Sequence, residues 1–144
     1  METQNYSTHK RFVPLFHYFL FPLLALTLIG SLVNLFKSIG DSERIYSASL
    51  IASICVILIF MFFFMRSFAI RAQDRAIRAE ENLRHFALTG KLLDSRLRMS
   101  QVIALRFSED EEFIELAKKA ADSNLSSNDI KKAIQKWKAD HHRV

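Results

Sequence analysis

Glycine, proline and cysteine are scarce in this chain of 144 residues, which contains three, two and one of them. Three glycines are too few for most of the glycine-rich loops that bind nucleotide phosphates. CxxC, HExxH and Gly-x-Ser-x-Gly motifs are also absent. The lone Cys55 cannot form a disulfide within the chain, and we interpret it as a small apolar residue in a span rather than a redox or metal ligand. We therefore predict no enzymatic activity, no cofactor and no small-molecule substrate.

Charge is also scarce, but only in the first half of the chain. Residues 12–65 carry four charged side chains, whereas residues 66–144 carry 16 Lys or Arg and 12 Asp or Glu. The net charge of +5 is thus spread unevenly and does not by itself indicate a nucleic-acid partner. The most basic helical stretch, 131–138, follows an acidic one that would repel phosphate, so we predict no nucleic-acid binding.

The first uncharged run, residues 12–36, is 25 residues long. It exceeds the apolar core of a secretory signal peptide, and no small-x-small cleavage site closes it, so a retained membrane span is predicted. Pro14 falls in the first turn, where a missing N–H costs little. Pro22 is interior, removes the bond to the carbonyl of Tyr18, and predicts a kink there.

The second uncharged run, residues 45–65, opens a stretch of 49 positions between Gly40 and Gly90 without glycine or proline. Its 21 residues would extend roughly 32 Å as a helix, enough to cross a bilayer core. From Arg66 the same stretch becomes charged. We predict that the span continues without a break into a cytoplasmic helical stalk, residues 66–89, ended by Gly90 in the left-handed conformation.

The short connection, residues 37–44, predicts an external turn between two antiparallel spans. It has two basic residues, against seven beside the other span ends, so the positive-inside bias places both termini in the cytoplasm. The predicted organisation is then an N-terminal tail 1–11, spans 12–36 and 45–65, the stalk, and a helical domain 90–144. Lipids are expected partners. The residues predicted to face the headgroups are Lys10, Arg11, Arg66 and Arg71.

Residues 90–144 predict an all-α domain of short helices. Ser100, Ser108 and Ser126 are predicted caps, Ser108 as a capping box with Glu111. One face of the last helix is predicted to carry Ile130, Ala133, Ile134 and Trp137. Net charge alternates, with +5 over residues 66–107, −5 over 108–129 and +4 over 130–144. These blocks are either solvated faces or docking surfaces, within a subunit or between subunits.

Small and hydroxylic residues gather near the external turn in both spans and predict close packing between them. The eight residues are Thr27, Gly30, Ser31, Asn34, Ala48, Ser49, Ala52 and Ser53. The other halves of the spans are rich in phenylalanine, and we expect them to splay, with the rings facing lipid or a neighbouring subunit.

A second apolar stripe follows in the stalk, with the a/d spacing of a coiled coil. This seam consists of Ala69, Ala72, Ala76, Ala79, Leu83 and Phe86. At fewer than three heptads, its spacing leaves open whether it meets another subunit or the chain's own tail.

Histidines are the remaining candidates for chemistry. His17, within the first span, is either a haem ligand or proton carrier, or an anchor at the headgroups beside Tyr18. His141 and His142 are adjacent and cannot share a helix face as metal ligands, so we interpret them as a solvated terminus.

The assembled pieces resemble an uncharacterised family of small bacterial two-span membrane proteins, over nearly the whole chain. The matching residues are Gln4–Tyr6, His9, Arg11, Pro14, His17, Tyr18, Leu83–Phe86, Leu88–Asp94, Ala104–Phe107, Asp110–Glu112, Ile130–Ile134 and Trp137–His141. The resemblance implies a bacterial inner-membrane location and supplies no activity. It makes His17, Tyr18, His85 and Asp94 candidate members of functional polar motifs.

These patterns are compatible with three functions. The first is a non-enzymatic scaffold or accessory subunit, as a homo-oligomer or within a larger membrane complex. The second is a small oligomeric channel or transporter component lined by Thr27, Ser31 and Asn34. The third is a haem-binding redox subunit that uses His17.

Overall fold

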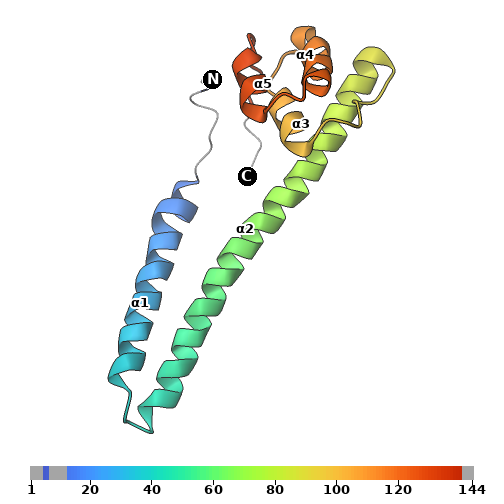
Figure 1. Ribbon diagram of the computed structural model, residues 1–144. Helices are drawn as coiled ribbons and strands as arrows, with labels where there is room; N and C mark the ends of the chain where they lie inside the picture. Colours follow the sequence, from blue (N-terminus) through green and yellow to red (C-terminus); the bar gives the residue numbers. More distant parts are fainter. Residues whose placement is uncertain (1–4, 7–12, 141–144) are drawn as a thin grey trace. The chain divides into compact units, whose positions relative to one another are not determined.

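The computed structural model describes residues 5–6 and 13–140, and every regular element in them is a helix (Figure 1). In chain order these are η1 (Leu15–Leu20), α1 (Phe21–Lys37), α2 (Arg44–Thr89), α3 (Met99–Leu105), α4 (Asp110–Asp122) and α5 (Ser127–Ala133). The all-α fold class is confirmed. The described chain divides into two units, residues 13–69 in one and residues 70–140 with Asn5 and Tyr6 in the other.

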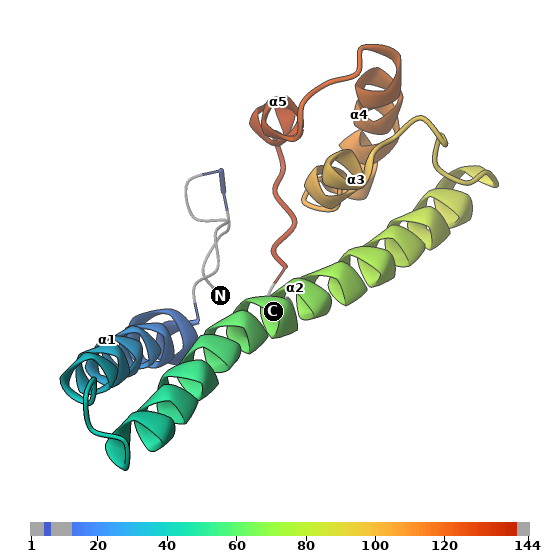
Figure 2. The ribbon, with the colours of Figure 1, turned by 60° about the horizontal axis from the view of Figure 1, so that its bottom comes forward.

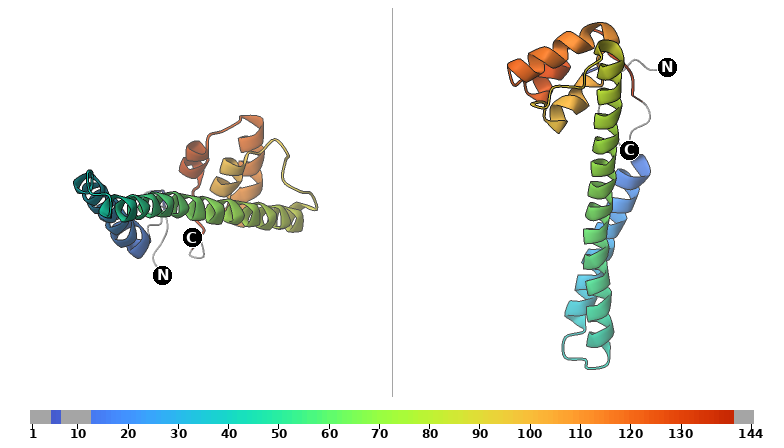
Figure 3. Two further views of the ribbon diagram at one scale, coloured as in Figure 1. Left: turned by 90° about the horizontal axis from the view of Figure 1, so that it is seen from below. Right: turned by 90° about the vertical axis from the view of Figure 1, so that its right-hand side faces the viewer.

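The first unit is a pair of helices, with η1 and α1 running beside the early part of α2 in all views (Figures 1 and 3). The turn between them is tight. Gly40 adopts a φ of +94°, and the Asp41 carboxylate accepts the backbone N–H groups of Glu43 and Arg44 at 3.1 and 3.2 Å, which satisfies donors at the start of α2. α1 ends at Lys37 and α2 begins at Arg44, so the connection between the two helices consists of residues 38–43.

A π-helical segment, η1, stands where the sequence predicts a kink. The N–H of Phe21 donates to the carbonyl of Phe16, five residues back, and Pro22 follows in the first turn of α1. The ring of Pro22 would clash with the Tyr18 carbonyl in a regular α-helix, and the wider turn separates the two.

Aromatic rings join the two helices at the end away from the turn. Phe16 stacks on Phe62 with ring centroids 4.1 Å apart, and Phe21 lies 5.7 Å from Phe62 and 6.2 Å from Phe63. The expectation that these rings all face outward was therefore wrong for this group, because offset and edge contacts between rings stabilise the pair.

In the second unit, α3, α4 and α5 lie on one side of the distal part of α2 (Figures 2 and 3). Their core consists of Ile77, Leu97, Val102, Ala104, Leu105, Phe107, Phe113, Leu116, Ala117, Ala120, Ile130 and Ile134. Ile77 is the member from α2, so the apolar faces of the short helices bury mostly against one another.

Two of the three predicted caps were wrong. Ser126 does cap α5, where its hydroxyl accepts the N–H of Asp129 at 3.1 Å. Ser100 lies inside α3, which begins after Arg98. Ser108 is fully buried and its hydroxyl donates to the Leu105 carbonyl at 2.6 Å, so the first residue before α4 is Glu109.

The last helix is shorter than its apolar pattern predicts. α5 ends at Ala133, and Trp137 forms an isolated antiparallel bridge with Ser108. The Glu112 carboxylate also accepts two backbone N–H groups, those of Gln135 and Lys136, at 3.1 Å each. These partners from elsewhere in the fold replace the helical hydrogen bonds, so Trp137 packs on Phe107 from an extended segment.

Candidate functional site

Arg84 fastens α4 to α2. Its Nε donates to Asp110 Oδ1 at 2.6 Å, its Nη2 to the Ser108 carbonyl at 2.7 Å and its Nη1 to Glu81 Oε2 at 3.2 Å. The guanidinium also lies over the Phe113 ring, 4.2 Å from the centroid. Glu80 stands four residues before Arg84, at the spacing of an ion pair along one helix, but the planar fork of arginine reaches several acceptors at once only in the tertiary fold.

Burial perturbs two charged groups beside this contact. The pKa of Glu81 is raised because the carboxyl is buried, although Arg84 acts in the opposite direction. The pKa of Arg106 is lowered by burial, partly offset by Asp140, whose carboxylate lies 3.0 Å from its Nη1. Arg106 also lies over the Phe107 ring at 4.8 Å. Each of the two groups has an oppositely charged partner close by, Arg84 for Glu81 and Asp140 for Arg106.

The polar motif around His85 reverses the chain after α2. Gly90 has a φ of +73° and its N–H donates to the Phe86 carbonyl at 2.7 Å. Nδ1 of His85 lies 2.7 Å from the Lys91 carbonyl, and the Thr89 hydroxyl donates to the His85 carbonyl at 2.7 Å. The motif therefore has a structural role, as a helix end that holds the following loop.

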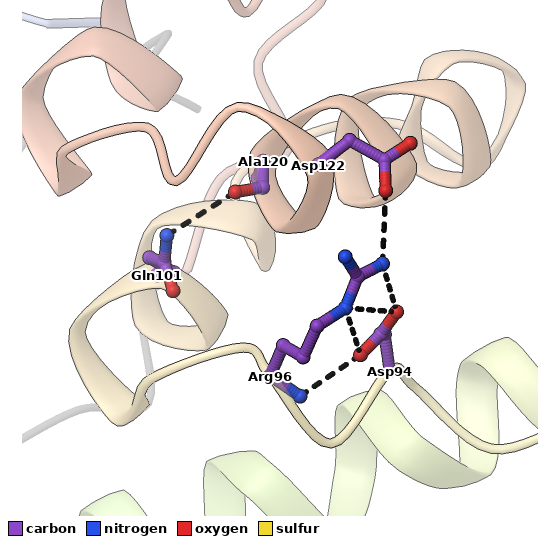
Figure 4. A network of polar contacts seen from close by, with 5 residues as sticks. All are labelled: Asp94, Arg96, Gln101, Ala120 and Asp122. Atoms are coloured by element: carbon purple, nitrogen blue, oxygen red, sulfur yellow. Dashed lines mark hydrogen bonds and ion pairs between the residues drawn. The ribbon is translucent and has the colours of Figure 1, made fainter.

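Asp94 organises the next part of the loop through Arg96, as Figure 4 shows. Two guanidinium nitrogens of Arg96 donate to the Asp94 carboxylate, and Nη2 also reaches Asp122 of α4 at 2.8 Å. These bonds to Arg96 lower the pKa of Asp94 to about 2 and raise the pKa of Arg96. Asp94 thus holds the loop against α4, and nothing in its contacts indicates a ligand.

Gln101 is a buried polar residue that the sequence analysis missed. Its amide nitrogen donates to the Ala120 carbonyl at 3.3 Å (Figure 4) and to the Leu125 carbonyl at 2.8 Å. Its Oε1 accepts the N–H of Arg98 at 2.7 Å. It therefore joins the start of α3 to the end of α4 and the loop after it. The sequence carried no signal for this role, because a glutamine near a helix start is ordinarily solvated.

The charge blocks dock within one chain. Ion pairs connect the acidic block of residues 108–129 to both basic blocks, and the pairs are Arg84–Asp110, Arg96–Asp122 and Lys136–Glu111. The side chains of Arg96–Asp122 and Lys136–Glu111 remain at least half exposed, so these pairs lie on solvated faces, whereas Arg84 is covered by the domain. Docking between subunits is not needed to pair them.

The predicted seam, by contrast, is exposed along its whole length. All six of its residues are exposed, with Leu83 at 68% and Phe86 at 51%. The domain packs instead on the opposite face of α2, where Ile77 and Glu81 are buried. Within residues 13–140 the seam therefore does not pack against the helical domain, which the spacing alone left open.

The eight predicted span-packing residues fall into two groups. Ser31, Ala48 and Ala52 are buried and Ser49 is half-buried, whereas Thr27, Gly30, Asn34 and Ser53 are exposed. No atom lies within 4 Å of a Cβ built on Gly30, so this glycine is not needed for a close approach within the pair. The buried side of the first span contains Ser31 and Ser38, with Leu28 and Leu35 half-buried between and beside them.

The hydroxyls proposed to line a channel bond within their own helix. Thr27 donates to the Leu23 carbonyl at 2.8 Å and Ser31 to the Leu28 carbonyl at 2.7 Å. Thr27 also lines a groove of about 160 Å³ with Cys55 and four leucines. Because Ser31 is buried and the groove is apolar, this arrangement does not favour a water-filled path.

The remaining predicted residues show no common site. Nδ1 of His17 lies 3.0 Å from the Val13 carbonyl, and Tyr18 is exposed. Arg66 lies over the Phe16 ring at 5.4 Å, and Arg71 is exposed. Among the described residues no group of three His, Cys, Asp or Glu side chains could hold a metal ion. The predictions for His9, Lys10, Arg11, His141 and His142 fall outside the described residues.

One family matches the chain over residues 1–144, under the description "Family of unknown function (DUF6526)". The chain belongs to this family. DUF6526 thus covers α1, α2 and the helical domain of residues 90–144 in one continuous match. The comparisons with curated proteins and with solved structures found no match.

Two helices, Leu15–Lys37 counted from η1 and Arg44–Thr89, are long and apolar enough to cross a membrane.

Proposed function

We propose that this protein is a non-enzymatic scaffold or accessory subunit, held in the bacterial cytoplasmic membrane by two spans with both termini in the cytoplasm. It presents the helical domain of residues 90–144 to a partner within an assembly. The observation that carries the proposal is the division of α2 beyond residue 70 into two faces. One face holds the chain's own domain and the other leaves an apolar seam uncovered.

The low burial of the two apolar helices supports the membrane location. Only 6% and 17% of their most apolar windows are buried, whereas the core helix of a soluble protein would be mostly covered. The distribution of lysine and arginine supports the orientation, since two lie at the turn and seven beside the other ends.

Topology is tested on intact cells and on membranes. Protease added outside intact cells should not cut the chain beyond Arg66, and washing without detergent should not release the protein. Cleavage of that segment, or release of the chain into the wash, overturns the membrane proposal.

The scaffold role is tested by crosslinking in native membranes, followed by a pull-down and mass determination. The expected result is a crosslinked species heavier than the chain, either a homo-oligomer or a complex with other membrane proteins. A strictly monomeric species with no partner contradicts the proposal.

A further inference from the structure

The seam on α2 has the geometry of a coiled-coil face within a single structural unit. Five of its members fall in residues 70–140, namely Ala72, Ala76, Ala79, Leu83 and Phe86, with spacings of 4, 3, 4 and 3. All five are exposed, although the last two are large apolar side chains. Burying such a face against a complementary one would remove apolar surface from water, which favours association.

Two charged residues flank the seam at positions that pair across a parallel coiled coil. With Ala76 at a and Ala79 at d, Arg75 occupies g and Glu80 occupies the following e position. In a parallel, in-register pair, g of one helix faces the e position five residues further along the other. Arg75 of each copy would then meet Glu80 of its neighbour, twice in a symmetric dimer.

Neither of these two side chains forms an ion pair or a hydrogen bond in the part of the chain that the structure describes, and both residues are exposed. The charge of Glu80 still acts on Arg106 and Glu81 within the same unit. Arg84, which the sequence offers as a partner for Glu80, is instead held by Glu81 and Asp110. The charges beside the seam thus complement those of a second, parallel copy.

We propose that the seam is the interface of a parallel homodimer, with Arg75 paired to Glu80 of the second copy. This inference rests on the proposed membrane scaffold, because two copies inserted with the same topology present their stalks in parallel. Sharing a membrane also raises their effective concentration, which allows a seam of fewer than three heptads to suffice. Alanines at three of the five positions allow the two backbones to approach closely.

Disulfide crosslinking of the full chain in native membranes tests the interface and its direction. In a Cys55→Ala background, Ala72→Cys and Ala79→Cys are made separately and oxidised. Both positions are d and lie about 10.5 Å apart along the helix. Both should give disulfide-linked dimers. Ile70→Cys, exposed and on another side of the same helix, is the control and should give at least fivefold less.

Each other pattern overturns the proposal. Crosslinking at one of the two positions alone indicates antiparallel or crossed helices. Equal crosslinking at position 70 indicates random collision, and linkage to a heavier unlike protein indicates a different occupant. Native mass spectrometry from lipid nanodiscs should find two copies, and a larger ring contradicts the dimer.

Charge reversal tests the specific pairing. Arg75→Glu and Glu80→Arg should each lower the dimer-to-monomer ratio about fivefold, because like charges then face each other twice. The double variant should restore the ratio, since the pair is rebuilt with its signs exchanged. The pairing of Arg75 with Glu80 is contradicted if the double variant has a dimer-to-monomer ratio as low as the single variants. It is also contradicted if the single variants leave that ratio unchanged.

A separate readout distinguishes this inference from the scaffold role. If the pull-down recovers a partner protein while both seam cysteines remain unlinked, the homodimer proposal is wrong and the scaffold proposal is supported. If neither a partner nor a linked dimer is found, both proposals are wrong.

Discussion

The guanidinium of Arg84 lies on the face of Phe113, 4.2 Å from the ring centroid, and connects the stalk helix to α4. The same group donates to Glu81, Asp110 and the Ser108 carbonyl, and its side chain is only 12% exposed. One arginine thus supplies a cation–π contact and three hydrogen bonds at the boundary between α2 and the domain. This makes it the side chain on which the docking of the domain most depends.

Replacing Arg84 by Met should lower the free energy of unfolding by about 3 kcal/mol, because Glu81 loses its cation while still buried. The methionine side chain keeps most of the apolar contact with Phe113. The decrease in the free energy of unfolding therefore measures the loss of the hydrogen bonds and ion pairs of Arg84. Urea unfolding of the full chain in mild detergent measures it through the fluorescence of Trp137, the one tryptophan of the sequence. Lys118→Met, an exposed change on α4, is the control and should stay within about 0.5 kcal/mol. Equal losses in both variants would contradict the role of Arg84.

Glu81 should make the stability depend on pH. Burial raises its pKa in the folded state above the ordinary 4.5, so the folded chain holds this proton more tightly than the unfolded chain. Its ionisation therefore costs stability as the pH rises through the folded pKa, and the cost disappears toward pH 4.5. Unfolding midpoints of the native chain and of Glu81→Gln, measured from pH 4.5 to 7.5, should diverge with rising pH, with the native chain falling relative to the variant. Parallel curves would mean that the carboxyl titrates alike in both states.

Gln101→Leu should destabilise the domain by about 2 kcal/mol, although leucine is more apolar and fits a buried position. The Leu125 carbonyl and the Arg98 N–H would lose the partner that Gln101 supplies, and the Ala120 carbonyl would keep only the N–H of Leu125. Hydrogen exchange of the α3 and α4 amides measures the loss locally. Gln135→Leu, on an exposed side chain, provides the comparison. A Gln101 variant as protected as the native chain would show that the network is dispensable.

Two glycines should respond in opposite ways to alanine. Gly90→Ala should cost about 1 kcal/mol or more, because its φ of +73° is a strained conformation for any residue with a Cβ. Gly30→Ala should be neutral or stabilising, since Gly30 is helical and its Cβ would meet nothing within 4 Å. Thermal unfolding in detergent compares the two. If Gly30→Ala instead lowers the unfolding temperature while the monomer keeps its fold, Gly30 lies in a contact with another chain.

Periodicity and composition were sufficient to predict the helices whose formation depends little on contacts with the rest of the fold. The absence of glycine and proline between Gly40 and Gly90 predicts α2 to its last residue, and Gly90 predicts the end. The two apolar runs predict α1 and the first part of α2. These features are local, since propensity, capping and the length of an apolar run act over a few turns of one helix.

The sequence by itself determined the all-helical class, the number and length of the apolar helices and the place where the stalk ends, because each depends on neighbouring residues along the chain. Only the tertiary structure decided the partners of Arg84, the buried role of Gln101, the early end of α5 before Trp137, and which face of α2 the domain covers. Those depend on contacts such as Gln101–Ala120, Arg84–Asp110 and Ser108–Trp137, whose residues are 19, 26 and 29 positions apart, and no pattern within one helix records which group lies opposite a side chain after folding.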